Sequence, residues 1–497
     1  MVAVGEWWWV PDEEQCFVPA RVTSINGADA SLDADGAPVS CPTAKLTTKI
    51  DSPDLLDAQL DDLVQMDQVN HPAIIDTLRR RYRSDKIYTG IADILVAMNP
   101  FKWLPVYTPA HVTEYAKGDQ EAPPHPFKTT MNAYNGLRES RCAQAILISG
   151  ESGAGKTETT KQCLKMLSEC AGGGRKGEAG VEERLLSTNP VLETLGNAKT
   201  VRNDNSSRFG KFMQIHFDAN FRIAGCDVVD YLLEKSRVTS PGPNERSYHV
   251  FYQLCKMAAG RKGLVDAGEY PYLAKSGCVA VHAIDDGEEW KAFTAALTQL
   301  GYVAGEVDEL LDACCGVLLG SRIHFAEGAE EGSNVVGDLD AGGKRHRRGS
   351  AVAGHAMDAC SECAEAFGVS HDALAECLTH RTISVGGQAL KANLNPADAE
   401  DCRDALAKHA YGALFRATVQ RVNAALASAS TKKGGVLEPV VPRDDVGPAA
   451  RRPPAVTARA ARRARTPRPP PPRSPGYLKL QSLRSPRTSS RGRTSPP

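Results

Sequence analysis

The sequence Gly-Glu-Ser-Gly-Ala-Gly-Lys-Thr at residues 150–157 has the residue types and spacing of a phosphate-binding loop, Gly-x4-Gly-Lys-Thr. Glycines let the backbone curl so that successive N–H groups face an anion, and a following helix adds the positive end of its dipole. Lys156 can then reach the β- and γ-phosphates of a nucleotide, and Thr157 can offer a hydroxyl to Mg²⁺. The other predicted nucleotide-binding residues of this loop are Gly150, Glu151, Ser152, Gly153, Ala154 and Gly155.

The segments on both sides of this loop are of the kind that such a loop needs. Residues 145–148 are continuously apolar, which predicts a strand buried on both faces. Residues 157–170 contain no Gly or Pro and place Leu164 and Leu167 at helical spacing. Because a strand, a glycine-rich loop and a helix follow one another, we expect a nucleoside triphosphate site rather than a chance match in a glycine-rich turn.

A second polar segment, Asn-Asp-Asn-Ser-Ser-Arg-Phe-Gly-Lys at residues 203–211, could also face phosphate. The adjacent hydroxyls of Ser206 and Ser207 could complete a Mg²⁺ shell, and Arg208 could stabilise charge that develops on a γ-phosphate. An apolar segment at 212–217 follows. Taken alone, the same residues also fit an ordinary surface loop.

Length and composition predict a globular protein of two or three units, since the chain has 497 residues of which 42% are hydrophobic. No apolar run approaches about 18 residues, the length that a membrane span requires. The first residues lack the basic and then apolar layout of a signal peptide. Fourteen cysteines without a regular framework fit a reducing compartment.

The net charge of −1 conceals an uneven distribution. Residues 451–497 contain twelve Arg, one Lys and no acidic residue, a charge of +13, so the rest of the chain carries −1 − 13 = −14. The same stretch has eleven prolines and few apolar residues, so it cannot bury enough surface to offset its ordering entropy. We expect a disordered, solvated tail at 436–497, with binding of nucleic acid or acidic filaments as the alternative.

The rest of the chain divides into two parts. Short β-like pieces at 7–10, 17–22 and 30–32 predict a small β-barrel or hairpin unit over residues 1–45. Residues 46–435 alternate helical patterns with apolar strands, as in an α/β core. The expected helices are 54–65, 71–83, 351–367, 371–378 and 397–427, the expected strands are 91–97, 145–149, 212–217 and 228–233, and the expected surface loops are 171–180 and 328–350.

Four metal-ligand side chains have a spacing that resembles a zinc site, Cys360-x2-Cys363 and Cys377-x2-His380. Cys360 and Cys363 also share a helical face with Phe367, and buried cysteine behaves as a small hydrophobic residue. We therefore expect packing at these cysteines, with zinc binding as the alternative.

These motifs, in this order, resemble the myosin motor head over roughly residues 5–435. Residues 99–107 (Asn-Pro-Phe-Lys-Trp-Leu-Pro-Val-Tyr) look like its purine-binding loop, 150–157 like its phosphate loop and 196–211 like its switch I. The sequences at 231–238, 245–254 and 404–408 are similar to later segments of the same head. The resemblance implies an α/β fold with a P-loop NTPase core of myosin type.

The resemblance also implies roles for single residues. Asn99, Lys102 and Tyr107 would line the adenine site of ATP, and residues 150–156 would hold its phosphates. Thr157 and Ser207 would ligate Mg²⁺. The residues around the γ-phosphate and the attacking water would be Asn203, Ser206 and Arg208, together with Lys156. Residues 381–394 would meet actin filaments, and the protein would be a cytoplasmic one that associates with the cytoskeleton.

The resemblance stops near residue 435, where the family continues into the strand and Asp-Ile-x-Gly-Phe-Glu motif of switch II. We therefore expect an incomplete central sheet with flanking helices, with unpaired strand edges and apolar surface. Asp338 and Asp340 are weak candidates for a substitute carboxylate. Two functions follow: an actin-based motor head that hydrolyses ATP, or an ATP–Mg²⁺ binding module without efficient turnover. Light chains, a membrane span and nucleic acid are not expected as partners.

Overall fold

The computed structural model describes residues 1–53, 56, 58, 60–119, 121–172, 181–328, 332–336, 358–385, 388–427 and 477–482. Within these residues no helix is both long and apolar enough to cross a membrane.

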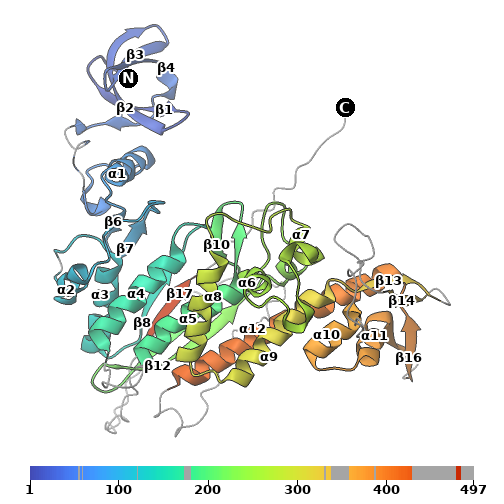
Figure 1. Ribbon diagram of the computed structural model, residues 1–497. Helices are drawn as coiled ribbons and strands as arrows, with labels where there is room; N and C mark the ends of the chain where they lie inside the picture. Colours follow the sequence, from blue (N-terminus) through green and yellow to red (C-terminus); the bar gives the residue numbers. More distant parts are fainter. Residues whose placement is uncertain are drawn as a thin grey trace, which may run out of the picture.

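An antiparallel sheet forms the N-terminal end of the molecule (Figure 1). Its strands are β1 (Trp7–Asp12), β2 (Cys16–Asn26), β3 (Asp29–Ala34), β4 (Ala37–Pro42) and β5 (Lys49–Ile50), in the order β4, β3, β2, β1, β5. The three predicted β pieces lie in β1, β2 and β3 and are confirmed. Their inward side chains form a small separate core that includes Val10, Val22 and Leu32.

The segment after this sheet differs from the sequence prediction in two places. The expected helix at 54–65 is wrong at the residues that the structure describes, where Leu56 and the short turn η3 (Leu63–Gln65) are 3₁₀ and no residue is α-helical. A helix cannot continue through Asp62, because its extended backbone bridges Gly90; its side chain instead caps the start of η3 by accepting from the N–H of Val64. The expected strand at 91–97 is a hairpin of β6 (Tyr88–Ile91) and β7 (Ile94–Ala97), with Ala92 at φ +50° in the turn. Helix α1 (His71–Arg83) is confirmed.

The central sheet has four strands in the order β12, β11, β17, β8. They are β8 (Gln144–Ile148), β11 (Gly210–Phe217), β12 (Ile223–Tyr231) and β17 (Tyr477–Ser482). β17 is parallel to β8 and antiparallel to β11, which is itself antiparallel to β12. The expectation of a disordered tail at 436–497 is therefore wrong at these six residues, and the remainder of that segment lies outside the described residues.

Helices cover the sheet unevenly. α3 (Pro126–Ser140) and α4 (Lys156–Ala171) pack on β8 and β17, whereas α5 (Val181–Gly196) and α12 (Pro396–Leu426) pack on β12. The predicted helix at 157–170 is confirmed as α4, with Leu164 and Leu167 fully buried. The prediction that the preceding strand is buried on both faces is wrong, because Leu147 of β8 is 62% exposed on the side that these helices do not cover.

A long helix joins the two ends of the α/β part. In α12 the buried residues Tyr411, Phe415, Val419 and Val422 recur every three or four positions and form one stripe against its neighbours. This helix agrees with the prediction at 397–427. The other helices are α2 (Pro109–Ala116), α6 (His249–Met257), α7 (Pro271–Ala274), α8 (Asp286–Gln299), α9 (Ala304–Gly320), α10 (Ala359–Phe367) and α11 (His371–Thr379), with 3₁₀ turns at η1 (Thr43–Lys45), η4 (Lys235–Val238), η5 (Arg261–Gly263) and η6 (Ala267–Glu269).

Two hairpins and two short helices form the end opposite the N-terminal sheet (Figure 1). The hairpins pair β13 (His324–Glu327) with β14 (Ser333–Val336), and β15 (His380–Val385) with β16 (Gln388–Asn393). The expected loop at 328–350 thus contains a strand, and Asp338 and Asp340 lie outside the described residues. The helix predicted at 351–367 is confirmed from Ala359, where Asp358 caps it by accepting from the N–H of Ser361.

The cysteines with zinc-like spacing pack rather than converge. Cys360 and Cys363 are both 1% exposed, and the Cys363 thiol donates to the Gly316 carbonyl of α9 at 3.3 Å. Cys377 is exposed, so the expectation that it also packs is wrong. Among the described residues, no group of three or more His, Cys, Asp and Glu side chains could hold a metal ion.

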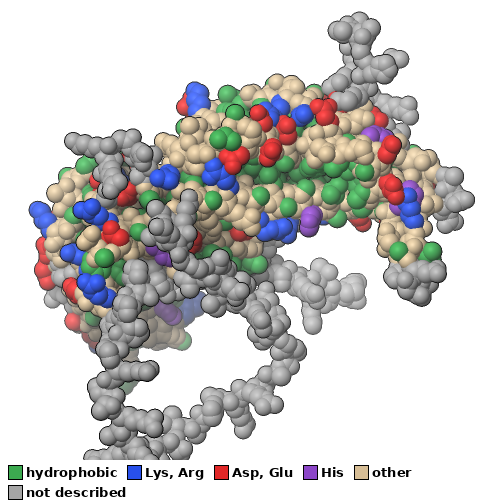
Figure 2. Space-filling model, turned by 90° about the horizontal axis from the view of Figure 1, so that it is seen from below, with side chains coloured by type: hydrophobic (Ala, Val, Ile, Leu, Met, Phe, Trp, Pro, Cys, Tyr) green, Lys and Arg blue, Asp and Glu red, His purple; other side chains and the backbone are tan. Residues whose placement is uncertain are grey.

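Apolar side chains also gather on the outer surface. Figure 2 shows a band of hydrophobic side chains along one face of the body. Leu147 lies in the edge strand β8 and is 62% exposed, and Leu232, the residue after the opposite edge strand β12, is 83% exposed. The expectation of unpaired strand edges is wrong between β8 and β11, where β17 pairs with both, whereas the exposed Leu147 agrees with the expected apolar surface.

A pair of leucine substitutions tests the uneven burial of the phosphate-loop strand and helix. We expect Leu164→Ala to lower the free energy of unfolding by about 3 kcal/mol, because it empties a fully buried site. Leu147→Ala should change it by less than about 0.5 kcal/mol, as for an exposed side chain. Urea denaturation of both variants measures the difference. An equal cost would show that the outer face of β8 is covered in solution.

Candidate functional site

The phosphate-type loop lies between the last residue of β8, Ile148, and the first residue of α4, Lys156. Gly153 and Gly155 have φ of +85° and +93°, a left-handed conformation that a side chain would strain. Gly155 is the N-cap of α4 and no side chain caps this helix. The N–H groups of its first turn are therefore directed at the concave side of the loop, as an anion requires.

Lys156 curls back over this loop. Its Nζ donates to the carbonyl oxygens of Gly150 and Glu151, at 2.7 Å each. Partial burial lowers the pKa of this ammonium from its ordinary value, and nearby Glu151 opposes the change. The ammonium group of Lys156 is thus held within the loop, where the phosphates of a nucleotide would lie.

Two hydroxyl pairs join the loop to the second predicted segment. Ser152 Oγ and Ser206 Oγ are 2.8 Å apart, and Thr157 Oγ1 and Ser207 Oγ are 3.1 Å apart. A Cβ on Gly153 would lie 3.6 Å from the carbonyl oxygen of Arg202, an ordinary van der Waals contact, so the positive φ rather than a lack of space favours glycine here. Residues that are 49 to 54 positions apart in the sequence therefore meet along one seam.

The second segment is a hairpin rather than an open loop. It pairs β9 (Asn197–Thr200) with β10 (Asn203–Ser207). The side chain of Asn203 bonds to the backbone of Asn205, at 3.1 Å through both its oxygen and its nitrogen. The structure therefore places Asn203 on its own hairpin, whereas Ser206 and Ser207 face the loop.

Of the three residues expected to line the adenine site, only Asn99 forms an observed hydrogen bond with the phosphate-type loop. Asn99 Nδ2 donates to the Gly153 carbonyl at 2.6 Å. Lys102 instead forms an ion pair with Asp85, with 2.6 Å between Nζ and Oδ1. Tyr107 bonds through its hydroxyl to Tyr88, and its carbonyl accepts from Lys165 of α4 at 3.0 Å. Tyr107 thus lies beside the helix of the loop.

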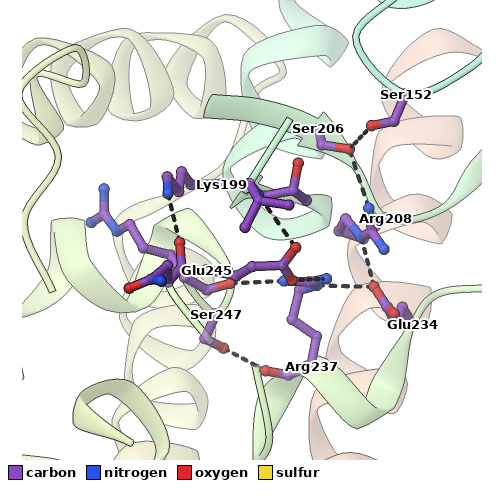
Figure 3. A network of polar contacts seen from close by, with 12 residues as sticks. Ser152, Lys199, Ser206, Arg208, Glu234, Arg237, Glu245 and Ser247 are labelled. Atoms are coloured by element: carbon purple, nitrogen blue, oxygen red, sulfur yellow. Dashed lines mark hydrogen bonds and ion pairs between the residues drawn. The ribbon is translucent and has the colours of Figure 1, made fainter. Parts of the chain in front are cut away.

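Arg208 is held by a carboxylate that the sequence did not single out. Its Nε donates to Glu234 Oε2 at 2.6 Å, and its Nη1 donates to Ser206 Oγ at 3.2 Å. Glu234 also accepts from Arg237 Nε at 2.9 Å, and Arg237 pairs with Glu245 at 2.8 Å (Figure 3). No spacing rule could have found a partner that is 26 positions away from Arg208.

The charge of Glu234 is stabilised by this network. Burial would raise its pKa, but the hydrogen bonds from Arg208 and Arg237 outweigh burial and lower the pKa to about 2. The side chains of Arg208 and Glu234 are only 9% and 10% exposed, so solvent screens the pair weakly. A continuous chain of polar contacts consequently runs from Ser152 in the loop to Glu245 (Figure 3).

The hydroxyl oxygens of Thr157 and Ser207 at the seam are suitable ligands for Mg²⁺, a hard cation that also binds phosphate oxygens. Mg²⁺ takes oxygen ligands and usually keeps several waters and phosphate oxygens in its shell. Thr157 and Ser207 present two hydroxyl oxygens that are 3.1 Å apart, close enough to sit on one ion. These two residues fit a Mg²⁺–phosphate complex, in which the phosphates supply the negative charge.

Comparison with known proteins agrees with this geometry. The model of the myosin head (motor domain) family matches residues 60–438, more than half of the chain. Unconventional myosin-Ic of Rattus norvegicus is 41% identical over 362 residues, which cover 72% of this chain and 33% of that protein. Myosin-7 of Arabidopsis thaliana is 34% identical over 444 residues, 88% of this chain and 25% of that protein.

The chain thus spans a third or less of the length of these relatives. The family match covers the loop, the hairpin that faces it and the Glu234 network, all of which lie within residues 60–438. By its sequence, this chain belongs to the myosin head (motor domain) family.

Proposed function

We propose that this chain binds ATP with Mg²⁺ at the seam between residues 150–157 and 203–208. The observation that carries the proposal is the pair of hydroxyl contacts, Ser152 with Ser206 and Thr157 with Ser207. They bring the candidate phosphate-binding and metal-binding groups of both segments to one place. A phosphate chain laid along the first turn of α4 would meet all of them.

Each group has a distinct task in this proposal. The backbone N–H groups of the loop and Lys156 hold the phosphates, and Thr157 and Ser207 hold the cation. Bound Mg²⁺ would neutralise charge on the β- and γ-phosphate oxygens. Ser206 and Arg208 orient groups at the γ-phosphate, and Asn99 keeps the loop in place through the Gly153 carbonyl. Lys102 and Tyr107 are assigned to the adenine side.

Two functions use such a site. In the first, the chain is part of an actin-based motor head that couples ATP hydrolysis to binding of actin filaments. The β15–β16 hairpin carries exposed Ile383 and Leu390, and it is the surface that we assign to actin. In the second, the chain holds ATP–Mg²⁺ without efficient turnover. The side-chain hydrogen bonds observed for Ser206 in the described residues are to Ser152 and Arg208, and the carboxylate of Glu234 is linked to it only through Arg208.

Replacement of the loop cation tests nucleotide binding. Lys156→Ala should weaken binding of a fluorescent ATP analogue by about a hundredfold, because a charge-assisted contact to phosphate is worth about 3 kcal/mol. Fluorescence titration with Mg²⁺ present measures the affinity. Lys291→Ala is the matched control, because this lysine is 67% exposed on α8 and pairs only with Glu288 among the ion pairs observed. Equal affinities for the two variants would refute the site.

A measurement of ATP turnover on the same protein distinguishes the two functions. Phosphate release is measured with and without actin filaments. Turnover that actin accelerates identifies the motor head, whereas tight binding with negligible turnover identifies the binding module. Loss of both would contradict each of them.

The Glu234 network gives a prediction for stability and its pH dependence. Glu234→Gln should lower the free energy of unfolding by about 3 kcal/mol at pH 7, because it leaves two buried arginines without their shared anion. The folded-state pKa of about 2 lies below the ordinary value of 4.5, so the stabilisation is complete above pH 4.5. It is lost as the pH falls towards 2, and the deficit of the variant should shrink over that range.

Glu245→Gln is the control, since it removes one partner of Arg237 and leaves Arg208 bound to Glu234. We expect this variant to be destabilised less than Glu234→Gln and to bind ATP like the unaltered chain. Urea denaturation between pH 3 and 7 compares the variants. A deficit of Glu234→Gln that stays constant with pH would contradict the assigned ion pairs.

A further inference from the structure

The slot between β8 and β11 in the central sheet is filled by a segment from the far end of the chain. β17 pairs with β11 from Lys211–Ser482 to His216–Tyr477, and with β8 from Gln144–Leu478 to Ile148–Ser482. It therefore has a hydrogen-bonded neighbour on each side. Fifty residues, 427–476, separate it from the end of α12 at Leu426. A chain of that length can span up to about 165 Å, so reach does not limit this docking.

The sequence of this segment differs from the rest of the tail. Residues 451–497 contain five large apolar side chains, and four of them fall within seven positions: Tyr477, Leu478, Leu480 and Leu483, the fifth being Val456. Pro475-Gly476 precedes this window and Pro486 follows it, as residues that interrupt strands do. It is thus the part of the tail best able to form a buried strand.

The position of β17 couples it to the candidate site. Its last residue, Ser482, lies level with Ile148, where the phosphate-type loop begins, and with Lys211, three residues after Arg208. Neighbouring strands are about 4.8 Å apart, so β17 holds β8 and β11 at about twice that distance. Without it, either the two strands close by about 5 Å or their inner edges stay unpaired. Closure would shift the loop relative to the hairpin, and unpaired edges would leave the spacing of β8 and β11 without a restraint, so the contacts of 2.8 and 3.1 Å at the seam are best supported with β17 in place.

Charge also favours docking within one molecule. The tail at 451–497 carries +13 and the rest of the chain −14. Opposite net charges on two parts of one chain raise the local concentration of the segment near the body. The α3 and α4 helices, which pack on β8, also pack on β17 and so cover the docked strand on one face.

We propose that Tyr477–Ser482 is an internal docking segment that completes the central sheet, and that the arrangement of the phosphate-type loop against Ser206 and Ser207 depends on it. The occupant of the slot is the tail of the same molecule. The proposal concerns the assembly of the sheet and holds whether or not the site binds ATP.

Hydrogen exchange on the full, unaltered chain without nucleotide tests the docking directly. Amides 478–482 should exchange at least about a hundredfold more slowly than in a free peptide of residues 470–490, as in other paired strands. The protection should be independent of protein concentration, because the strand belongs to the same molecule. Exchange at the rate of the free peptide would overturn the proposal, as would protection that appears only in a dimer.

A proline substitution in the full chain tests the dependence of the loop. Leu480→Pro removes an N–H from the middle of a strand that is paired on both sides. It should remove the protection of those amides in 146–148 and 213–215 that bond to β17, while the amides of β11 that bond to β12 stay protected, and it should weaken binding of the fluorescent ATP analogue at least about tenfold. Val456→Pro, in the proline-rich part of the tail, should leave both unchanged.

The outcomes keep this proposal apart from the proposed function. Unchanged protection of β8 and β11 in Leu480→Pro would overturn the dependence on β17. Protected amides at 478–482 in a chain that binds no ATP would contradict the nucleotide site alone. Should Leu480→Pro fail to fold, the exchange measurement on the unaltered chain still decides whether the segment is docked.

Discussion

The candidate site depends on one constraint: the loop at 150–157 must stay within hydrogen-bonding distance of the β9–β10 hairpin. The hydroxyl groups of the loop and the hairpin are in contact at 2.8 Å (Ser152 with Ser206) and 3.1 Å (Thr157 with Ser207). The loop is fixed by β8 and α4, and the hairpin continues through Arg208 into β11. Any change in the spacing of β8 and β11 therefore reaches the seam directly. The Glu234 network adds a second restraint, because it ties Arg208 to Arg237 and, through it, to Glu245.

The central sheet contains one strand that lies outside the region matched to the myosin head family. The family match ends at residue 438, and the strand between β8 and β11 comes from 477–482. This sheet is consequently assembled from residues inside and outside the matched region. Its outer strand β8 still exposes Leu147 at 62%, and Figure 2 shows an apolar band on one face of the body. In a myosin head assembled in this way, we propose that the position of the phosphate-type loop depends on a distal segment.

Local sequence patterns predicted the elements that carry the site but not their partners. The loop, the helix α4 and the strand β11 follow from glycine spacing and apolar periodicity, and Ser152 and Thr157 lie in hydrogen-bond contact with Ser206 and Ser207, while the roles of these residues stay predictions. Three features depended on contacts between distant residues and were out of reach of such patterns: the pairing of Arg208 with Glu234, the pairing of Lys102 with Asp85, and the docking of β17. The strand β17 was missed because the average composition of residues 451–497 is dominated by Arg and Pro, and six strand residues change that average little. The helix expected at 54–65 failed for a similar reason, since Asp62 is used in a bridge to Gly90.

The central claim is that the loop and the hairpin form one site for ATP and Mg²⁺. Hydrogen exchange of the full chain with and without ATP–Mg²⁺ tests it most directly, because it reports on both segments in one experiment. The account predicts that nucleotide slows exchange at 150–157 and at 203–208 together, and that ATP without Mg²⁺ slows it less at 203–208, where Ser207 would meet the cation. Slower exchange at 150–157 alone, with 203–208 unaffected by either addition, would contradict a shared site.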